Sequence, residues 1–268
     1  PVFSGNNGLW ASNEKNLSRT YSATSTDNGK SWGKVTDITD QVYGGVYGEG
    51  TRHGLFTGSG SGVQLKHGEH AGRLMLVVAA RNDASWGGTL SNYAVYSDDG
   101  GQSWQVSKNA ACVDGDEAKV VELANGNVLM SIRNRAKGHR LFSVSTDGGE
   151  TWSEPKLNET ILDPACNGDI VAYTYKGKNL LLHSLPASPT TRERVTVYVS
   201  EDNGETWMPK RCIYPGYSAY SSLQVLDDGT IGIIVEEGKW DGGLPGEDGF
   251  NLGYYRFNLP WLMAGVGE

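Results

Sequence analysis

The sequence predicts an all-β protein built from repeated small sheets. Its 268 residues include 37 glycines, 13 tyrosines and 8 tryptophans. Aromatic residues favour pleated strands, and glycine supplies the positive φ angles that tight turns need. The second observation is an eight-residue pattern, S-x-D-x-G-x-x-W, which occurs four times and starts at Ser25, Ser97, Ser145 and Ser200. Composition and repeat together indicate short antiparallel strands joined by turns of one kind.

Each copy of the pattern is predicted to lie in the turn between two strands. The four copies follow stretches that alternate or are apolar, namely TYSAT, NYAVY, RLFSV and VTVYV. In such a turn the aspartate can accept hydrogen bonds from the backbone N–H groups ahead of it, and the glycine can take a left-handed conformation. The tryptophan can then return to pack on the sheet. We therefore interpret the four aspartates as scaffolding and not as catalytic groups.

The spacing of the repeats predicts a β-propeller. Asp27, Asp99, Asp147 and Asp202 stand 72, 48 and 55 residues apart, which is the length of a four-stranded sheet. Three full sets of four strands can be read between the copies. One set is KVVELA, VLMSIRN, RLFSVS and WSEPKL, and the last is GDIVAYTY, NLLLHSLP, VTVYVS and WMPKRCI. Only one strand is expected before the first copy, and three follow the last full set: SSLQVL, IGIIVEE and LGYYRFNLPW.

A propeller normally closes by pairing strands from its two ends, which avoids exposed sheet edges. We therefore expect residues 1–268 to form one propeller domain of roughly four to five blades that lacks its N-terminal blade.

Charge and hydropathy exclude some functions. The net charge of −8 argues against a nucleic-acid partner, because a phosphate-binding surface needs clustered Lys and Arg. No apolar run approaches the roughly 18 residues of a membrane span. The opening PVFSGNNGLW lacks the features of a signal peptide, so any targeting segment is expected to be absent or removed.

The cysteines and histidines do not indicate a metal centre. Cys112, Cys166 and Cys212 are widely separated, and no C-x-x-C or H-E-x-x-H spacing accompanies the five histidines. We expect buried structural thiols, with one disulfide as the alternative, and no metal or cofactor.

The segments between the repeats resemble the bacterial-type exo-α-sialidases (neuraminidases), a family of six-bladed propellers that remove terminal sialic acids. The resemblance runs through FTGSGSGVQL, DEAKVVELANGNVLMSIRN, DPACNGDIVAY, RERVTVYVSEDNGETW and YSSLQVLDDGTIGIIVEE, and so covers nearly the whole chain. It implies a retaining glycoside hydrolase that acts on sialylated glycans without a cofactor. It also implies a secreted, periplasmic or cell-surface location.

The chemistry of the substrate explains which residues such a site needs. A sialic acid carries a carboxylate on the carbon that reacts, so arginines suit its binding and a carboxylate nucleophile would be repelled. A tyrosine hydroxyl avoids that repulsion, and sialidases are known for a tyrosine nucleophile. Its pKa of about 10 requires an adjacent base.

The resemblance implies that Tyr220, in AYSSLQVL, is the nucleophile and that Glu117, in GDEAKVVEL, is its base. Tyr217 in PGYS is a competing tyrosine, and Glu117 could instead be a solvated loop carboxylate beside Asp114 and Asp116.

Two arginines are expected to bind the substrate carboxylate. Arg133, in MSIRNR, matches the second member of the arginine triad of the family, and Arg135 would share its face if the strand continued. The third member is placed at Arg192 in TTRERVTV, with Arg194 as the alternative.

A supporting carboxylate is implied at Glu236, which would hold the first arginine of the triad by a salt bridge. Its neighbour Glu237 lies on the opposite side of the strand, so only one of the two should point inward. The Arg-Ile-Pro motif that supplies the first arginine does not occur in the chain. That arginine and the acid/base aspartate are expected on a segment upstream.

Two further features each have more than one interpretation. Asp169 in PACNGDI stands where many relatives have a small hydroxyl residue and could alter the binding pocket. The Gly-rich segment RNDASWGGTLSNY, which holds Trp86, either shapes substrate access or is a plain connector.

Two other functions fit the same scaffold. One is a non-catalytic propeller that binds glycans or protein. The other is a transglycosylase that passes the sialyl group to a sugar or forms an anhydro product.

Overall fold

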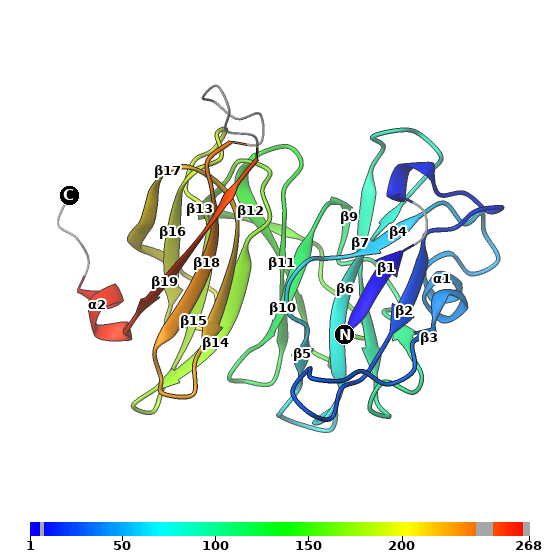
Figure 1. Ribbon diagram of the computed structural model, residues 1–268, viewed down its shortest axis with the longest axis horizontal. Coiled ribbons are helices and arrows are strands. Elements are labelled where there is room, and N and C mark those ends of the chain that lie inside the picture. Colours follow the sequence, from blue (N-terminus) through cyan, green and yellow to red (C-terminus); the bar gives the residue numbers. More distant parts are fainter. Residues whose placement is uncertain (6–7, 240–248, 265–268) are drawn as a thin grey trace. The chain divides into compact units, whose positions relative to one another are not determined.

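A computed structural model describes residues 1–5, 8–239 and 249–264, which fold mostly into antiparallel strands (Figure 1). The chain forms two compact units. The first contains residues 1–120, 126–128 and 143–155, and the second contains residues 121–125, 129–142 and 156–268. The predicted all-β class is confirmed.

The first unit contains two sheets. One has the order β1-β2-β3, and in the other β4, β6, β7 and β8 follow one another, with β5 paired to β6 and β9 to β7. The strands are β1 (Val2–Gly5), β2 (Arg19–Ser22), β3 (Thr36–Asp37), β4 (Leu55–Thr57), β5 (Val63–Gln64), β6 (Leu74–Arg81), β7 (Leu90–Ser97), β8 (Gln105–Val106) and β9 (Cys112–Gly115).

Two short helices accompany these sheets: η1 (Leu9–Ala11), a 3-10 helix, and α1 (Thr39–Tyr47). The buried face of α1 presents Val42 and Tyr43 to a core that also contains Leu55, Val78 and Trp104. Helix α1 was not predicted from the sequence.

A third sheet has the order β10-β11-β12-β13, and its residues are divided between the two units. Its strands are β10 (Ala118–Glu122), β11 (Val128–Ile132), β12 (Gly138–Ser145) and β13 (Lys156–Asp163). They correspond to the predicted strands KVVELA, VLMSIRN, RLFSVS and WSEPKL, except that the last begins at Lys156 and not at Trp152.

The second unit contains a run of six paired strands. They are β14 (Asp169–Tyr175), β15 (Lys178–Pro186), β16 (Glu193–Ser200), β17 (Met208–Val225), β18 (Ile231–Glu237) and β19 (Asn251–Phe257), followed by α2 (Leu259–Met263). Their core is aliphatic, with Leu182, Val197, Leu223 and Ile233 almost fully buried.

Three further details differ from the sequence prediction. The N-terminal sheet has three strands, because β1 precedes the single strand expected there. The segments WMPKRCI and SSLQVL are parts of one strand, β17, which pairs with β16 up to Tyr217 and with β18 from Ser218 onward. The predicted strand LGYYRFNLPW stops at Phe257, because Asn258 caps a helix and accepts a hydrogen bond from the Trp261 backbone.

The four repeats, called here the aspartate turns (residues 25–32, 97–104, 145–152 and 200–207), join β2 to β3, β7 to β8, β12 to β13 and β16 to β17. In the turn at 200–207, Asp202 Oδ1 accepts from the Thr206 backbone at 2.9 Å, and its Oδ2 accepts from the Thr206 hydroxyl. Gly204 has a φ of +88°. The other three turns repeat these bonds, so the predicted turn role of the aspartates is confirmed.

The tryptophans of the aspartate turns do not all pack alike. Trp104, Trp152 and Trp207 are 8%, 6% and 3% exposed, and each indole N–H donates to a carbonyl of its own turn. Trp32 is 55% exposed. The predicted return of the tryptophan to the sheet therefore holds for three of the four turns.

The cysteines are all free. Cys112 and Cys166 are buried as predicted, and burial raises the pKa of the Cys112 thiol. Cys212 is exposed, so the expectation of a buried thiol is wrong there, because this residue lies on the open face of β17.

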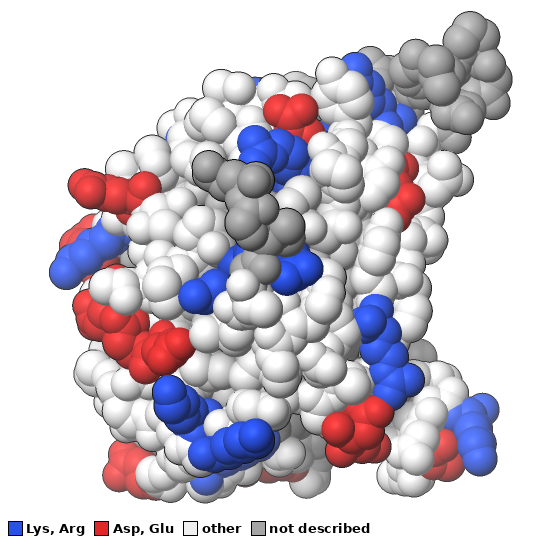
Figure 2. Space-filling view, turned by 90° about the vertical axis from the view of Figure 1, so that its left-hand side faces the viewer, with Lys and Arg blue, Asp and Glu red and all other residues white. Residues whose placement is uncertain are grey.

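Surface charges are mixed in sign. On the face drawn in Figure 2, described Lys and Arg side chains lie interspersed with Asp and Glu. Among the residues that the structure describes, no helix is both long and apolar enough to cross a membrane.

Candidate functional site

Tyr220 lies on β17, at the place where this strand changes partners. Pairing with β18 is irregular between Ser218 and Ser221, which breaks the strand alternation around Tyr220. The side chain is half-buried. Bulges of this kind commonly re-aim a side chain next to a binding site.

Arg133 reaches Tyr220 from the end of β11. Its Nη1 donates a hydrogen bond to the Tyr220 hydroxyl oxygen at 3.3 Å. The strand β11 ends at Ile132, and Ala136 N–H bonds to the Asn134 side chain, so the chain turns directly after Arg133. The strand therefore does not continue to Arg135, which was the requirement for Arg135 to share the face of Arg133.

Arg192 approaches the ring of the same tyrosine. Its guanidinium carbon lies 5.8 Å from the centroid of the Tyr220 ring, and its Nη2 donates to the Ala165 carbonyl at 2.9 Å. Arg194, the alternative, is exposed and has a φ of +61°. Of these two arginines, Arg192 is the one that the structure brings to Tyr220.

The neighbouring glutamates of β18 serve different partners. Glu236 Oε2 accepts from the Tyr220 backbone N–H at 3.0 Å. Glu237 accepts from the Tyr255 hydroxyl, and this hydrogen bond raises the pKa of Tyr255 to about 12. The two side chains thus point in different directions, as strand alternation predicts. Together Tyr220, Arg133, Arg192 and Glu236 form what we call the Tyr220 cluster.

The competing tyrosine has a different environment. Tyr217 is 46% exposed, and its ring lies 3.7 Å from the Lys239 ammonium nitrogen.

A buried ion pair supports the two arginine-bearing segments. Arg140 and Asp163 have fully buried side chains, and Arg140 Nη1 donates to Asp163 Oδ2 at 3.0 Å. The same carboxylate accepts from the Asn134 backbone, one residue after Arg133, and from the Cys166 backbone. Arg140 also donates to the Cys166 carbonyl, next to the Ala165 carbonyl that holds Arg192. No role for Asp163 was predicted, because no short-range sequence pattern links it to Arg140.

Asp169 is also a structural group. It is 3% exposed, and its Oδ2 accepts from the Leu223 backbone at 2.8 Å and from the Ser222 hydroxyl at 3.2 Å. These bonds tie β14 to the part of β17 that follows Tyr220. The expectation that Asp169 alters the binding pocket stays a prediction, since the contacts of its carboxylate are with β17.

Glu117 belongs to the first unit, immediately before β10. It is 6% exposed, and its Oε1 accepts from the Ser59 hydroxyl at 3.3 Å. It is therefore not the solvated loop carboxylate that was the alternative.

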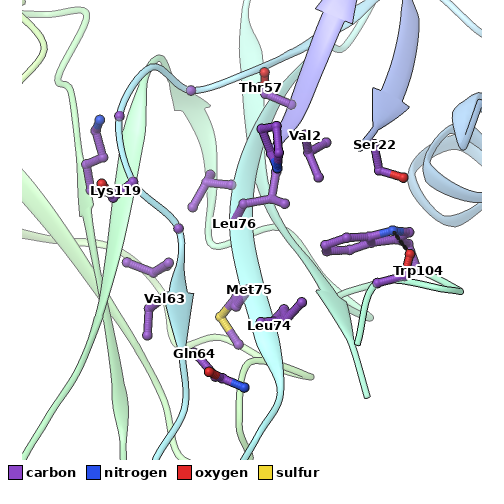
Figure 3. Close-up of a pocket in the computed structure, with 18 of the residues that line it drawn as sticks. Val2, Ser22, Thr57, Val63, Gln64, Leu74, Met75, Leu76, Trp104 and Lys119 are labelled. Atoms are coloured by element: carbon purple, nitrogen blue, oxygen red, sulfur yellow. Dashed lines mark hydrogen bonds between the residues drawn. The ribbon is translucent and has the colours of Figure 1, made fainter. Parts of the chain in front are cut away.

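The first unit also contains a cavity of about 350 Å³ (Figure 3). Thr57, Gln64, Met75, Trp104 and Lys119 are among its lining residues, and none of the predicted site residues lines it. Lys119 is 5% exposed and lies so close to Gly60 that a side chain at that glycine would collide with it. Ala118, the residue after Glu117, is nevertheless among the lining residues.

No metal centre is found in the described chain. Among residues 1–5, 8–239 and 249–264, no group of three or more His, Cys, Asp or Glu is placed to hold a metal ion. The Tyr220 cluster thus presents a phenol hydroxyl bonded to one guanidinium group, with a second guanidinium group over the phenol ring, and two guanidinium groups suit an anionic ligand.

Comparison with protein families and curated proteins gives a consistent set of relatives. A family model described as a BNR repeat-like domain matches residues 4–233. The chain is 36% identical over 248 residues to a sialidase of Micromonospora viridifaciens, a match that covers 90% of this chain and 35% of that protein. It is 28% identical over 203 residues to the anhydrosialidase of Macrobdella decora, with coverages of 68% and 26%. The chain spans 35%, 43% and 60% of the length of three curated sialidases that it matches.

Solved structures share the fold. The Hadza microbial sialidase Hz136 aligns with a TM-score of 0.78 and 25% identity, over 98% of this chain and 48% of that one. The intramolecular trans-sialidase from Ruminococcus gnavus aligns with a TM-score of 0.73 and 24% identity, over 94% and 52%. The fold is that of the sialidase β-propellers, which confirms the predicted fold class, while the number of blades stays a prediction.

Proposed function

The chain belongs to the BNR repeat-like domain family and, within it, to the bacterial-type sialidases, and from this premise we propose that it is part of the catalytic domain of an exo-α-sialidase. Such an enzyme is a glycoside hydrolase that removes terminal α-linked sialic acids from glycoconjugates. The proposal includes a secreted, periplasmic or cell-surface location, where such substrates are exposed.

The observation that carries the proposal is the convergence of Arg133 and Arg192 on Tyr220. The first donates to the hydroxyl oxygen and the second lies beside the ring. Two guanidinium groups offer bidentate hydrogen bonds and charge to the carboxylate of a sialic acid. The same carboxylate would repel an anionic nucleophile, whereas the neutral hydroxyl of Tyr220 is not repelled.

The proposed reaction proceeds in two steps with retention. Tyr220 Oη forms a bond to the anomeric carbon while the glycosidic bond breaks, and Glu117 takes the phenol proton. Arg133 stabilises the negative charge that develops on the phenol oxygen, because it donates a hydrogen bond to that atom. An acid/base aspartate protonates the leaving oxygen and then takes a proton from the water that releases the sialic acid.

Two components of this scheme are proposed to lie outside the chain. No Arg-Ile-Pro sequence occurs in its 268 residues, so the first arginine of the triad and the acid/base aspartate are assigned to a further segment of the same propeller. Glu236 would bind that arginine in addition to the Tyr220 backbone N–H. The proposed propeller has six blades, of which this chain supplies about four to five.

A substitution at the nucleophile tests the proposal. In the complete protein that carries this chain, Tyr220→Phe is expected to lower kcat/KM for a fluorogenic α-sialoside by about a thousandfold or more, as loss of a nucleophile does. Tyr217→Phe is the matched control and should retain activity. Unchanged turnover in Tyr220→Phe would remove Tyr220 from its role. NMR of the first-released anomer measures retention directly.

A transfer reaction is the second candidate, because the M. decora relative is named an anhydrosialidase and the R. gnavus structure an intramolecular trans-sialidase. Both reactions use the same tyrosyl intermediate and differ in whether water or a hydroxyl of the sugar attacks it. Product analysis by NMR separates them, since hydrolysis yields free sialic acid and intramolecular transfer yields its anhydro form.

A further inference from the structure

The second unit contains a buried histidine that takes no part in the proposed reaction. His183 stands on β15 and is fully buried. Its Nε2 lies 2.7 Å from the hydroxyl oxygen of Ser131, a residue of β11 that is also fully buried. Burial and the positive charge of Arg140 hold the pKa of His183 well below its usual value, so the imidazole is neutral at physiological pH.

A third group gives this contact a direction. Arg140 Nε donates to the same Ser131 oxygen at 2.9 Å. A guanidinium can only donate, so this bond uses a lone pair of the oxygen and leaves the hydroxyl hydrogen for Nε2 of His183. The guanidinium charge also strengthens the hydroxyl as a donor and opposes a second N–H directed at the same oxygen. This arrangement makes Nε2 the acceptor and places the imidazole proton on Nδ1.

The ring of His183 is closely packed, which fixes the position of Nε2. The ring stands edge-on to Phe142 and Trp207, at centroid distances of 6.1 and 5.8 Å and interplanar angles of 80° and 87°. A Cβ at Gly168 would come 2.9 Å from Cε1 of the ring, so glycine is needed there. The position of the acceptor therefore does not depend on the Ser131 bond itself.

Arg140 connects this contact to the segments that bear Arg133 and Arg192. Its Nη1 donates to Asp163 Oδ2 at 3.0 Å and to the Cys166 carbonyl at 2.8 Å. Asp163 also accepts from the backbone N–H directly after Arg133. The carbonyl directly before that of Cys166 accepts from Arg192. A shift of the Arg140 guanidinium would therefore loosen both arginines of the Tyr220 cluster.

The next residue of β15 reaches the strand of Tyr220. Ser184 Oγ lies 2.8 Å from the hydroxyl oxygen of Ser221, which directly follows Tyr220, and both serines are buried. Neighbouring residues of a strand point to opposite faces of the sheet. His183 and Ser184 thus contact the arginine support on one face and the strand of the proposed nucleophile on the other.

We propose that His183 is a positioning residue of the Tyr220 cluster. Its Nε2 accepts the hydrogen of the Ser131 hydroxyl and thereby fixes the orientation of Arg140. That orientation in turn aligns the two arginines of the cluster, Arg133 and Arg192. The effect on sialoside binding rests on the proposed function, whereas the alignment of the arginines does not.

NMR of the complete protein that carries this chain tests the alignment without substrate. The wild-type imidazole of His183 should have an unprotonated Nε2 at neutral pH in ¹⁵N spectra. His183→Phe keeps the aromatic volume but removes the acceptor, so the Nε–H signals of Arg133 and Arg192 should shift. Leu182→Val is the matched control, because Leu182 is a fully buried neighbour on β15 whose side chain lies in the aliphatic core.

Three results of this experiment would overturn the proposal. They are a protonated Nε2 in the wild-type protein, unchanged arginine signals in His183→Phe, and equal shifts in His183→Phe and Leu182→Val. If His183→Phe does not fold, Ser131→Ala removes the same bond and is judged by the same signals.

Kinetics provide the second readout. Two guanidinium groups bind the substrate carboxylate in both the ground state and the transition state, so their misalignment should raise KM more than it lowers kcat. His183→Phe and Ser131→Ala should each raise KM for an aryl α-sialoside about tenfold, and the double variant should be no worse than either, because both remove one bond. His183→Gln should recover most of the loss, since its amide oxygen replaces Nε2 as acceptor.

Additive losses in the double variant, or an unchanged KM in His183→Phe, would contradict the role of His183. A rise of KM in Leu182→Val equal to that in His183→Phe would do the same, because it would show a general effect of core packing. If the wild-type protein cleaves no sialoside, the proposed function fails, while the arginine signals still decide whether His183 positions the cluster.

Discussion

The aspartate turns and the Tyr220 cluster both rely on polar side chains, but their partners lie at very different distances along the chain. Each turn aspartate bonds to residues no more than four positions away. The bonds of Tyr220 reach Arg133, 87 residues away, and Glu236, 16 residues away. The turns are therefore determined by local sequence, whereas the cluster exists only when distant strands have found their register.

This difference has a functional consequence. In the turns the carboxylate accepts hydrogen bonds from backbone and hydroxyl donors of the same turn, so its negative charge stabilises the fold. In the cluster two guanidinium groups and a hydroxyl meet from separate segments and can engage a ligand. We expect substitutions in the turns to change stability, and substitutions in the cluster to change activity.

Asp163 is the residue at which one substitution should change both stability and activity. Asp163→Ala would leave the buried Arg140 guanidinium without its counter-ion, which costs about 3–5 kcal/mol of unfolding free energy. It would also release the Asn134 backbone next to Arg133, so activity should fall as well. Urea unfolding and sialoside turnover of the same variant measure both effects.

Asp163→Asn distinguishes the two roles, because it retains the acceptor oxygen for Asn134 while removing the charge. Full activity in Asp163→Ala would show that the ion pair does not position Arg133.

The tryptophans of the aspartate turns differ in burial, so their substitution should differ in its effect on stability. Trp207 is 3% exposed and stacks on Phe142 at a centroid distance of 5.7 Å, so Trp207→Ala should cost about 3–5 kcal/mol. Trp32→Ala should cost less than about 1 kcal/mol, because that side chain is already 55% exposed. Urea midpoints of the two variants test the prediction, and equal losses would contradict it.

The smallest expected effect is the pH dependence of a single turn. Hydrogen bonds from Ser31 and Ser25 lower the pKa of Asp27 from 3.8 to about 2. Between these values the unfolded state binds more protons, so the contribution of Asp27 to stability is complete above pH 4 and is lost as the pH falls toward 2.

Asp27→Asn should therefore destabilise the protein at pH 6 by more than it does at pH 3. The measurement is the difference in unfolding free energy between variant and wild type at each pH. A constant difference would show that the charge of Asp27 does not contribute.

Some elements were predictable because their causes are local. Alternating strands between glycine-rich turns, the repeat of residues 200–207 and the ends of β18 all follow from short-range pattern. The segment NLPW was predicted as strand and is helical from Leu259, because the capping bond of Asn258 outweighs the apolar pattern.

The sequence by itself determined the all-β class, the geometry of the aspartate turns and, through its resemblance to the sialidases, the residues expected in the site. These depend on side chains that act within a few positions or on motifs that can be matched directly.

Only the tertiary structure decided that Arg192 and not Arg194 faces Tyr220, that Asp163 and Arg140 support both arginine-bearing segments, and that Trp10 lies beside Trp86. The physical reason is that each of these contacts joins segments distant along the chain. Strand register, which depends on the packing of the whole sheet, brings such segments together.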